Sequence, residues 1–230
     1  MIVEVSNIVS GLVSEMDKTI TGVNFSYKVA TFCVTKWARK GKTIRRVTDG
    51  EEWFVEQVVG DESITASYMG NTFPEPIFEG VFELNNPFFI SGTKLATNRE
   101  WTIAGKDVTK KTPIIWLLET IRERVYGRGS SLELETELRM FFLDETNIVN
   151  FYTEDHRREV VYPMQQLVRE FVRTVEADKR FKTLEDYSMK TFSRFGVEKD
   201  NGVFQNVLDA NLSGVELNIT LTKYKENCKC

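Results

Sequence analysis

The sequence predicts an α+β fold: a mostly antiparallel mixed sheet with helices packed on one face and a long extended, β-rich insertion arm. Two observations predict this fold. Apolar side chains recur at helical spacing in two segments, and they alternate with polar side chains in several others. The chain has 230 residues, 41% of them hydrophobic, so it can bury a core. We expect residues 1–70 and 113–230 to form the core α+β domain and residues 71–112 to form the arm.

The first seventy residues predict one helix followed by an antiparallel meander. Apolar residues spaced three and four apart across residues 2–17 indicate an amphipathic helix. Alternating apolar residues across residues 23–37, rich in aromatic and β-branched side chains, predict one long strand. Two shorter apolar runs, at residues 53–59 and 63–69, flank a Gly-Asp turn and predict a hairpin.

Residues 71–112 interrupt this pattern, since prolines, glycines and asparagines separate short apolar runs. A plain loop of about 40 residues is too long for a compact domain, so the segment predicts an extended arm. Its aromatic side chains are costly to leave in water. These side chains either pack back on their own domain or dock on a neighbouring subunit. The candidate interface residues are Phe73, Phe78, Phe82, Phe88 and Phe89.

Two segments of the second half predict strands, and a third is predicted to be buried. That third segment, residues 113–118, is the densest apolar stretch. Leu132 to Phe142 alternates apolar with charged residues, which predicts a half-buried strand with an acidic outer face. Residues 215–222 alternate in the same way and predict the strand that closes the fold. The acidic face is a further candidate interface, formed by Glu133, Glu135 and Glu137.

A helix is predicted after Thr153, which supplies an N-cap, and its apolar face runs to Val175 with a kink or restart at Pro163. The single histidine, His156, lies in its first turn. A general base needs a nucleophile and an orienting group, and no such partner is spaced near His156 in the sequence. We interpret His156 as a solvated helix-start residue. The alternative is a hydrolase or nucleic-acid-processing factor that uses His156 with Asp155 or Glu154.

No other pattern in the sequence predicts catalysis, a cofactor or a metal. The chain has no Gly-rich phosphate loop and no zinc-ligand spacing. Asp144, Glu145, Asp155 and His156 imitate a metal site only superficially, because calcium-loop spacing is missing. The sequence therefore predicts no catalytic, cofactor-binding or metal-binding residues and a protein that is not an enzyme.

One concentrated basic run stands out in an otherwise acidic chain. The net charge of −4 gives no overall attraction for nucleic acid or an anionic membrane. The run resembles a positively charged hairpin tip, which can contact DNA phosphates in a lumen or an acidic patch on a partner, or be an ordinary solvated tip. Its residues are Arg39, Lys40, Lys42, Arg45 and Arg46.

The sequence also predicts where the chain is made. No apolar stretch approaches the roughly 20 residues that span a bilayer, and residues 1–5 lack the features of a signal peptide. The 3 cysteines are an odd number, which does not indicate a disulfide framework. We expect synthesis in a reducing cytoplasm and no membrane partner.

Five segments carry a resemblance to a known class of proteins: 113–118, 141–147, 153–156, 162–163 and 212–217. In them the chain resembles neck and tail ring proteins of Bacteroides-infecting phages, including the crAss-like podoviruses. The element order is also similar to tail-terminator and tail-completion proteins, which pack helices on a mixed sheet and assemble as rings.

The resemblance implies a non-enzymatic virion subunit without cofactor, made in the host cytoplasm. It implies a head-to-tail connector in the neck or tail, a ring homo-oligomer that binds its own copies and adjacent portal, neck and tail proteins. DNA passing through the lumen is a further candidate partner. A free-standing adaptor is the remaining hypothesis.

Overall fold

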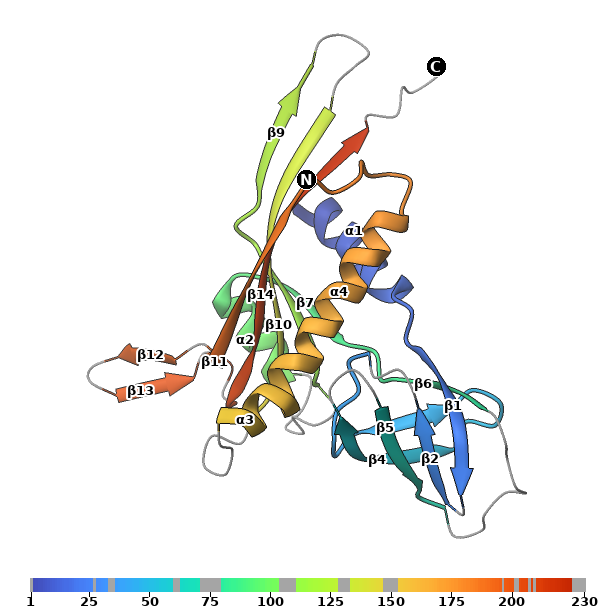
Figure 1. The fold of residues 1–230 in the computed structure, drawn as a ribbon. Helices are drawn as coiled ribbons and strands as arrows, with labels where there is room; N and C mark the ends of the chain where they lie inside the picture. The colour runs from blue at the N-terminus through green and yellow to red at the C-terminus, as the bar shows by residue number, and fades with distance from the viewer. Residues whose placement is uncertain are drawn as a thin grey trace.

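The computed structural model shows an α+β molecule that joins a closed β-barrel to a larger mixed sheet with helices (Figure 1). The structure describes residues 2–26, 28–32, 36–59, 63–70, 80–103, 111–127, 133–146, 153–195, 197–200, 203–206, 208 and 210–224. Its helices are α1 (Ile2–Glu15), α2 (Lys94–Ile103), α3 (Thr153–His156) and α4 (Tyr162–Ala177), with a π-helical turn, Arg157–Val161, between α3 and α4.

Six antiparallel strands close the barrel in the order β1-β2-β5-β4-β3-β6. They are β1 (Thr19–Ser26), β2 (Val29–Phe32), β3 (Thr43–Arg46), β4 (Glu52–Val59), β5 (Ser63–Tyr68) and β6 (Gly80–Glu83). Alternate side chains fill the interior, where the Phe82 ring lies edge-on to Phe32 and Trp53 at centroid distances of 5.0 and 5.5 Å. All three side chains are fully buried, so aromatic rings fill the barrel interior as part of the main core.

The predicted hairpin is confirmed, since β4 pairs with β5. The single strand predicted over residues 23–37 is wrong. Its described part forms two antiparallel strands, β1 and β2, that reverse at Lys28. Lys28 has a φ of +59°, a left-handed conformation that turns the chain and that hydrophobic alternation does not reveal.

The second sheet has the order β11-β14-β10-β8-β7, with β9 also beside β10. Its strands are β7 (Phe88–Gly92), β8 (Ile114–Leu118), β9 (Arg122–Tyr126), β10 (Glu133–Glu145), β11 (Tyr187–Phe195) and β14 (Leu212–Tyr224), and β12 (Val197–Asp200) and β13 (Val203–Asn206) form a separate hairpin. The strands β7 and β8 are parallel and the other pairs antiparallel. β10 and β14 pair along their whole length, which confirms both predicted alternating strands.

Helices lie on both faces of this sheet (Figure 1). α1 and α4 cover one side, here called the helix face, where Leu138, Met140 and Phe142 join the main core. On the opposite face, Trp101 of α2 packs with Trp116 in a second, smaller core. The prediction of helices on one face is therefore corrected: α2 brings a large apolar side chain to the other side.

The predicted insertion arm, residues 71–112, is also corrected. Its described part supplies β6, which closes the barrel against β1 and β3, and β7, which lies beside β8. Phe82 and Ile90 are 0% and 1% exposed, so burial of the segment's apolar side chains integrates it into both cores. Residues 71–79 and 104–110 lie outside the described residues.

The barrel is inserted between α1 and β7 in the chain. The chain enters at Lys18 and leaves at Leu84, whose N–H donates to the Lys18 carbonyl at 3.0 Å. The boundary between the two parts therefore lies at these neighbouring residues, and not at residues 70 and 113. From the barrel, the second sheet extends to the outer hairpin of β9 and β10 at the far end of the molecule (Figure 1).

Candidate functional site

The predicted basic run is divided among several contacts within the chain. An Arg39 Nη1 atom lies 2.5 Å from the carboxylate of Asp144, which is 1% exposed. Lys42 donates from Nζ to Thr112 Oγ1 at 2.6 Å. Because Asp144 belongs to β10 and Thr112 precedes β8, Arg39 and Lys42 join the barrel to the second sheet. We call these two contacts the barrel–sheet seam.

Arg46 is buried at the end of the barrel. Its guanidinium contacts the carboxylates of Asp49 and Glu51. Tyr68 donates to Glu51 at 2.9 Å, and this hydrogen bond raises the pKa of the Tyr68 hydroxyl. Arg46 therefore stabilises a polar network and is not available as a lumen residue.

The remaining two basic residues, Lys40 and Arg45, have exposed side chains. The Arg45 guanidinium is 3.8 Å from Glu83. Most of the positive charge of the run is thus neutralised by acidic residues or used in the seam, and no concentrated basic tip forms.

The candidate aromatic residues pack within their own chain. Phe82 is part of the barrel core, which makes its interpretation as a docking residue wrong. Phe88 and Phe89 are half-buried, with Phe88 against the smaller core and Phe89 against the main one. Phe73 and Phe78 lie outside the described residues.

The predicted acidic face is present, but two of its three carboxylates form ion pairs within the chain. Glu133, Glu135 and Glu137 are half-buried on the opposite face of β10, directly across from the strand β9. Glu137 lies 3.7 Å from Arg122 and 3.4 Å from Arg124, and Glu133 lies 2.6 Å from Lys182. Basic residues of the same chain thus offset the charge of this face, which sequence spacing did not reveal because they come from other elements.

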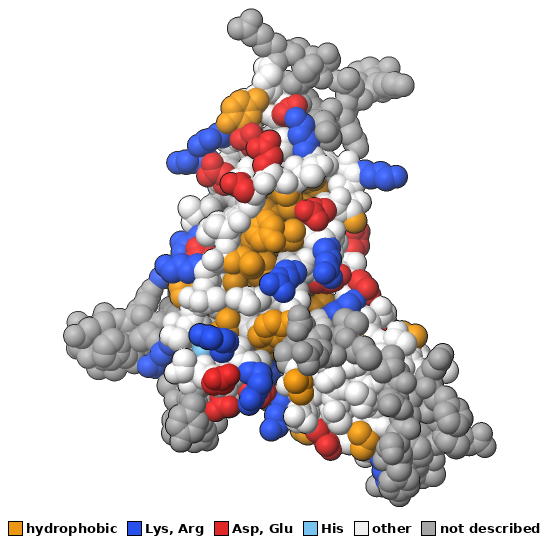
Figure 2. Space-filling model, viewed as in Figure 1, with side chains coloured by type: hydrophobic (Ala, Val, Ile, Leu, Met, Phe, Trp, Pro, Cys, Tyr) orange, Lys and Arg blue, Asp and Glu red, His pale blue; other side chains and the backbone are white. Residues whose placement is uncertain are grey.

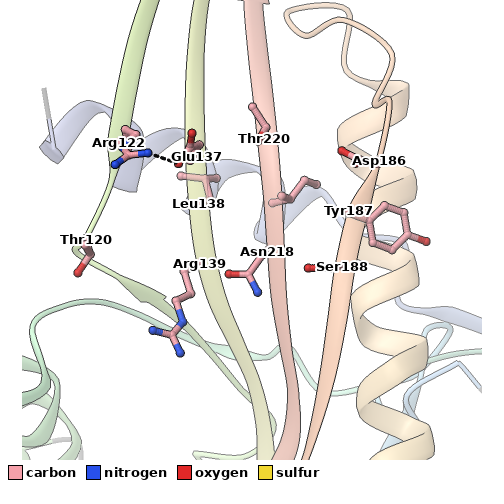
Figure 3. Close-up of a pocket in the computed structure, with 11 residues that line it drawn as sticks. Thr120, Arg122, Glu137, Leu138, Arg139, Asp186, Tyr187, Ser188, Asn218 and Thr220 are labelled. Atoms are coloured by element: carbon pink, nitrogen blue, oxygen red, sulfur yellow. Dashed lines mark ion pairs between the residues drawn. The ribbon is translucent and has the colours of Figure 1, made fainter.

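A groove of about 540 Å³ runs across β9, β10, β14 and the start of β11. Figure 3 shows Arg122 and Glu137 joined by an ion pair at one end of this groove, with Arg139 and Asn218 farther along it. Arg139 is itself paired with Glu216 at 2.5 Å. Both arginines are thus balanced by carboxylates, so the groove has no net field that would select an anion.

His156 lies at the end of the short helix α3, near the predicted helix start, but the prediction of a solvated side chain is wrong because the residue is half-buried. Burial lowers the pKa of its imidazole, and its buried Nε2 atom has no hydrogen-bond partner among the described residues. The neighbouring Asp155 carboxylate accepts from Arg158 at 3.0 Å. Among the described residues, no group of three or more histidine, cysteine, aspartate or glutamate side chains is arranged to hold a metal.

Three strands of the second sheet pair on one side only: among the described strands, β7 pairs with β8 alone, β9 with β10 alone and β11 with β14 alone. No residue of β7 is exposed, whereas most residues of β9 and β11 are. None of the nine residues of β11 is buried. Large apolar side chains are exposed on β9 and β11: Val125 at 65%, Tyr126 at 44%, Tyr187 at 40% and Met189 at 39%.

These edges are the feature that sequence reasoning missed. Figure 2 shows hydrophobic side chains gathered in the middle of the viewed face, where β11 and β14 run beside α4 (Figure 1). The only available signal was the alternation of Tyr187, Met189 and Thr191 with Ser188 and Lys190 in a segment that otherwise has mixed character.

No protein-family model, curated protein or solved structure matches the chain. In the part of the chain that the structure describes, no helix has the length and apolar character needed to cross a membrane.

Proposed function

We propose that the chain is a non-enzymatic structural subunit of a phage virion that forms a ring in the neck or tail and binds its own copies and adjacent ring proteins. The observation that carries an assembly role is the exposed open edge of two strands, β9 and β11. An open edge offers N–H and C=O groups to another chain, and large apolar side chains, Val125, Tyr126, Tyr187 and Met189, are exposed on these two strands.

The phage assignment rests on the resemblance, and the layer of α1 and α4 on one face of a mixed sheet supports it. This is the arrangement that the resemblance implies for terminator-like ring subunits. Within such a ring, Lys40 and Arg45 are the residues of the basic run whose exposed side chains remain for DNA or an acidic neighbour.

The hydrolase alternative finds less support in the site geometry. Its proposed base, His156, has no partner for Nε2 in the described part of the chain, and Asp155 is engaged by Arg158. The arginines of the groove across β9, β10, β14 and β11 are likewise paired with carboxylates. A catalytic group has to be held by an orienting partner and aimed at a reacting atom, which these contacts do not provide.

The proposal is tested by locating the chain in purified phage particles. Peptide mass spectrometry is expected to detect it at a constant copy number per particle, and particle imaging to place it as a ring in the neck or tail. Particles that lack the chain would refute the structural role. A His156→Ala variant is expected to assemble normally, whereas a hydrolytic activity that this variant abolishes would favour the enzyme.

A further inference from the structure

We propose that two copies of the chain pair antiparallel through β11 about a two-fold axis beside Met189, so that their second sheets become one continuous sheet. This inference goes beyond the proposed function. A ring needs head-to-tail contacts, whereas this contact uses the same surface of both copies and closes on a pair. The two-fold pair is therefore an association of the free chain, separate from ring contacts.

The edge itself is available for pairing. β11 has nine residues, its inner side is bonded to β14, and no residue from Tyr187 to Phe195 is buried. Tyr187 and Met189 are 40% and 39% exposed and alternate along the same strand, so they form a small apolar strip on this edge. A second strand on this edge removes that apolar area from water and pairs the free backbone groups.

Register with β14 determines which face each side chain occupies. Tyr187 is opposite Ile219 and Met189 opposite Leu217, both of which are core residues of the helix face. Side chains directly across a strand pair share a face. Tyr187 and Met189 therefore lie on the helix face, and Ser188 and Lys190 lie on the opposite face.

Self-pairing with Met189 across from the partner's Met189 matches apolar to apolar side chains. It also keeps the helices of both copies on the same side. Tyr187 then stands across from the partner's Thr191 and diagonal to the partner's Met189, within reach of a sulfur–aromatic contact. The four exposed apolar side chains of the two copies form one cluster, continuous with the core residues Leu217 and Ile219.

The charges of the opposite face agree with the same register. Ser188 stands across from the partner's Lys190, and Asp186, which precedes the strand, lies diagonal to that lysine. Both Asp186 and Lys190 are exposed. Diagonal neighbours are about 7–8 Å apart at the backbone, which a lysine side chain spans, and the two-fold axis repeats the ion pair.

Competing pairings place Lys190 less favourably. A shift of β11 by one residue on each copy places Lys190 across from the partner's Lys190. Pairing β11 with the exposed edge of β9 offers Lys190 no acidic partner from β9, because the residues of β9 on that face include Arg122 and Arg124, which are already paired with Glu137. Like charges directly opposite are destabilising, so the charges favour self-pairing at Met189.

α4 packs mainly on β10 and β14, and the π-helical turn Arg157–Val161 before it also touches β11. Across the two-fold axis, the two copies of α4 are about four strand spacings apart, roughly 19 Å, and a helix with its side chains is only about 10–12 Å wide. Tyr187 and Met189 of both copies line the sheet surface between the two helices.

The first test is charge reversal followed by sedimentation velocity over a range of concentrations. Two short paired strands make a small interface, so the wild-type dimer is expected to dissociate on dilution. Lys190→Asp and Asp186→Lys should each raise the dissociation constant about tenfold, and the double variant should restore it because it reverses both partners of the ion pair. Lys94→Asp, the same change at the exposed start of α2 beside β7, at the other end of the sheet, should have no effect.

The second test is a disulfide trap in a chain whose three cysteines, Cys33, Cys228 and Cys230, are replaced by serine. Met189→Cys should give a covalent dimer under mild oxidation, because directly opposed Cβ atoms are close to disulfide distance. Thr191→Cys, on the same face, should not. Circular dichroism checks that each variant is folded.

Three results would overturn the inference: a wild-type chain that stays monomeric at every concentration, a double charge variant that fails to recover, or a cross-link at position 191 in place of 189. All three are measured on the purified chain. A chain missing from phage particles would remove the proposed function and leave this pairing untouched.

Discussion

At the scale of single residues, His156 is the most direct test of the enzymatic alternative. Burial lowers the pKa of its imidazole, whereas a nearby carboxylate would favour the protonated ring and raise that pKa. The chain has 1 histidine, so its proton NMR signal is unambiguous. We predict a titration midpoint below 6.5, the usual value for histidine.

The same shift fixes the sign of a pH effect on stability. In the unfolded chain the imidazole binds its proton near its usual pKa, and in the folded chain it does so only at lower pH. Between the pKa of the folded state and that of the unfolded state, the unfolded chain therefore binds more protons. The free energy of unfolding falls as the pH drops through this range. A midpoint at or above 6.5 would instead indicate a carboxylate partner and return weight to the hydrolase.

Phe82 distinguishes a core residue from a docking residue. Its ring is fully buried between Phe32 and Trp53, so Phe82→Ala should lower the free energy of unfolding by about 3–5 kcal/mol. The neighbouring Val81 is 42% exposed, and Val81→Ala should change it by no more than about 0.5 kcal/mol. Urea denaturation measures both. Equal, small effects would mean that Phe82 is not in the core.

At the scale of elements, two glycines predict opposite effects of the same substitution. Gly214 in β14 has a φ of +155°, and an added Cβ would overlap the Phe142 carbonyl oxygen of β10 and lie 3.0 Å from Leu143 Cα. Gly214→Ala should therefore destabilise the protein by about 2 kcal/mol. Gly11 in α1 has no atom near that position, so Gly11→Ala should stabilise the protein by about 0.5–1 kcal/mol. Guanidinium midpoints that move in the same direction would contradict this assignment.

Elements with regular alternation could be predicted from the sequence, and elements defined by distant partners could not. Over residues 133–140 and 215–222, β10 and β14 have one apolar and one polar face, so period-two alternation located them. β6 has four residues and its place depends on pairing with β1 and β3, more than thirty residues away in the chain. Closure of the barrel therefore left no local signal.

The candidate site follows the same rule. Glu133, Glu135 and Glu137 were correctly placed on one face, but their neighbours, Lys182 and the arginines of β9, come from other segments and could not be identified. The importance of β11 depends on its position at the edge of the sheet, which is a property of topology and not of local composition.

At the scale of the whole molecule, the barrel and the second sheet depend on each other through a narrow connection. The chain crosses between them at two adjacent residues, Lys18 and Leu84. Beyond this, the barrel–sheet seam contributes the Arg39–Asp144 ion pair and the hydrogen bond from Lys42 to Thr112. Apolar residues of both parts also belong to one continuous core, so we expect the intact protein to unfold as one unit.

Asp144→Asn should make the barrel unfold before the second sheet. The change keeps the shape of the side chain but removes its charge, which leaves the Arg39 guanidinium, 12% exposed, without an ionised partner and lowers the free energy of unfolding by about 3 kcal/mol. In hydrogen exchange at increasing denaturant, the barrel strands β2 and β5 should then lose protection before β10 and β14, whereas the wild-type chain loses both together. Asp155→Asn removes a surface pair with Arg158 and should cost no more than about 1 kcal/mol without splitting the transition. If Asp144→Asn unfolds as cooperatively as the wild type, the continuous apolar core, and not the seam, holds the barrel to the sheet.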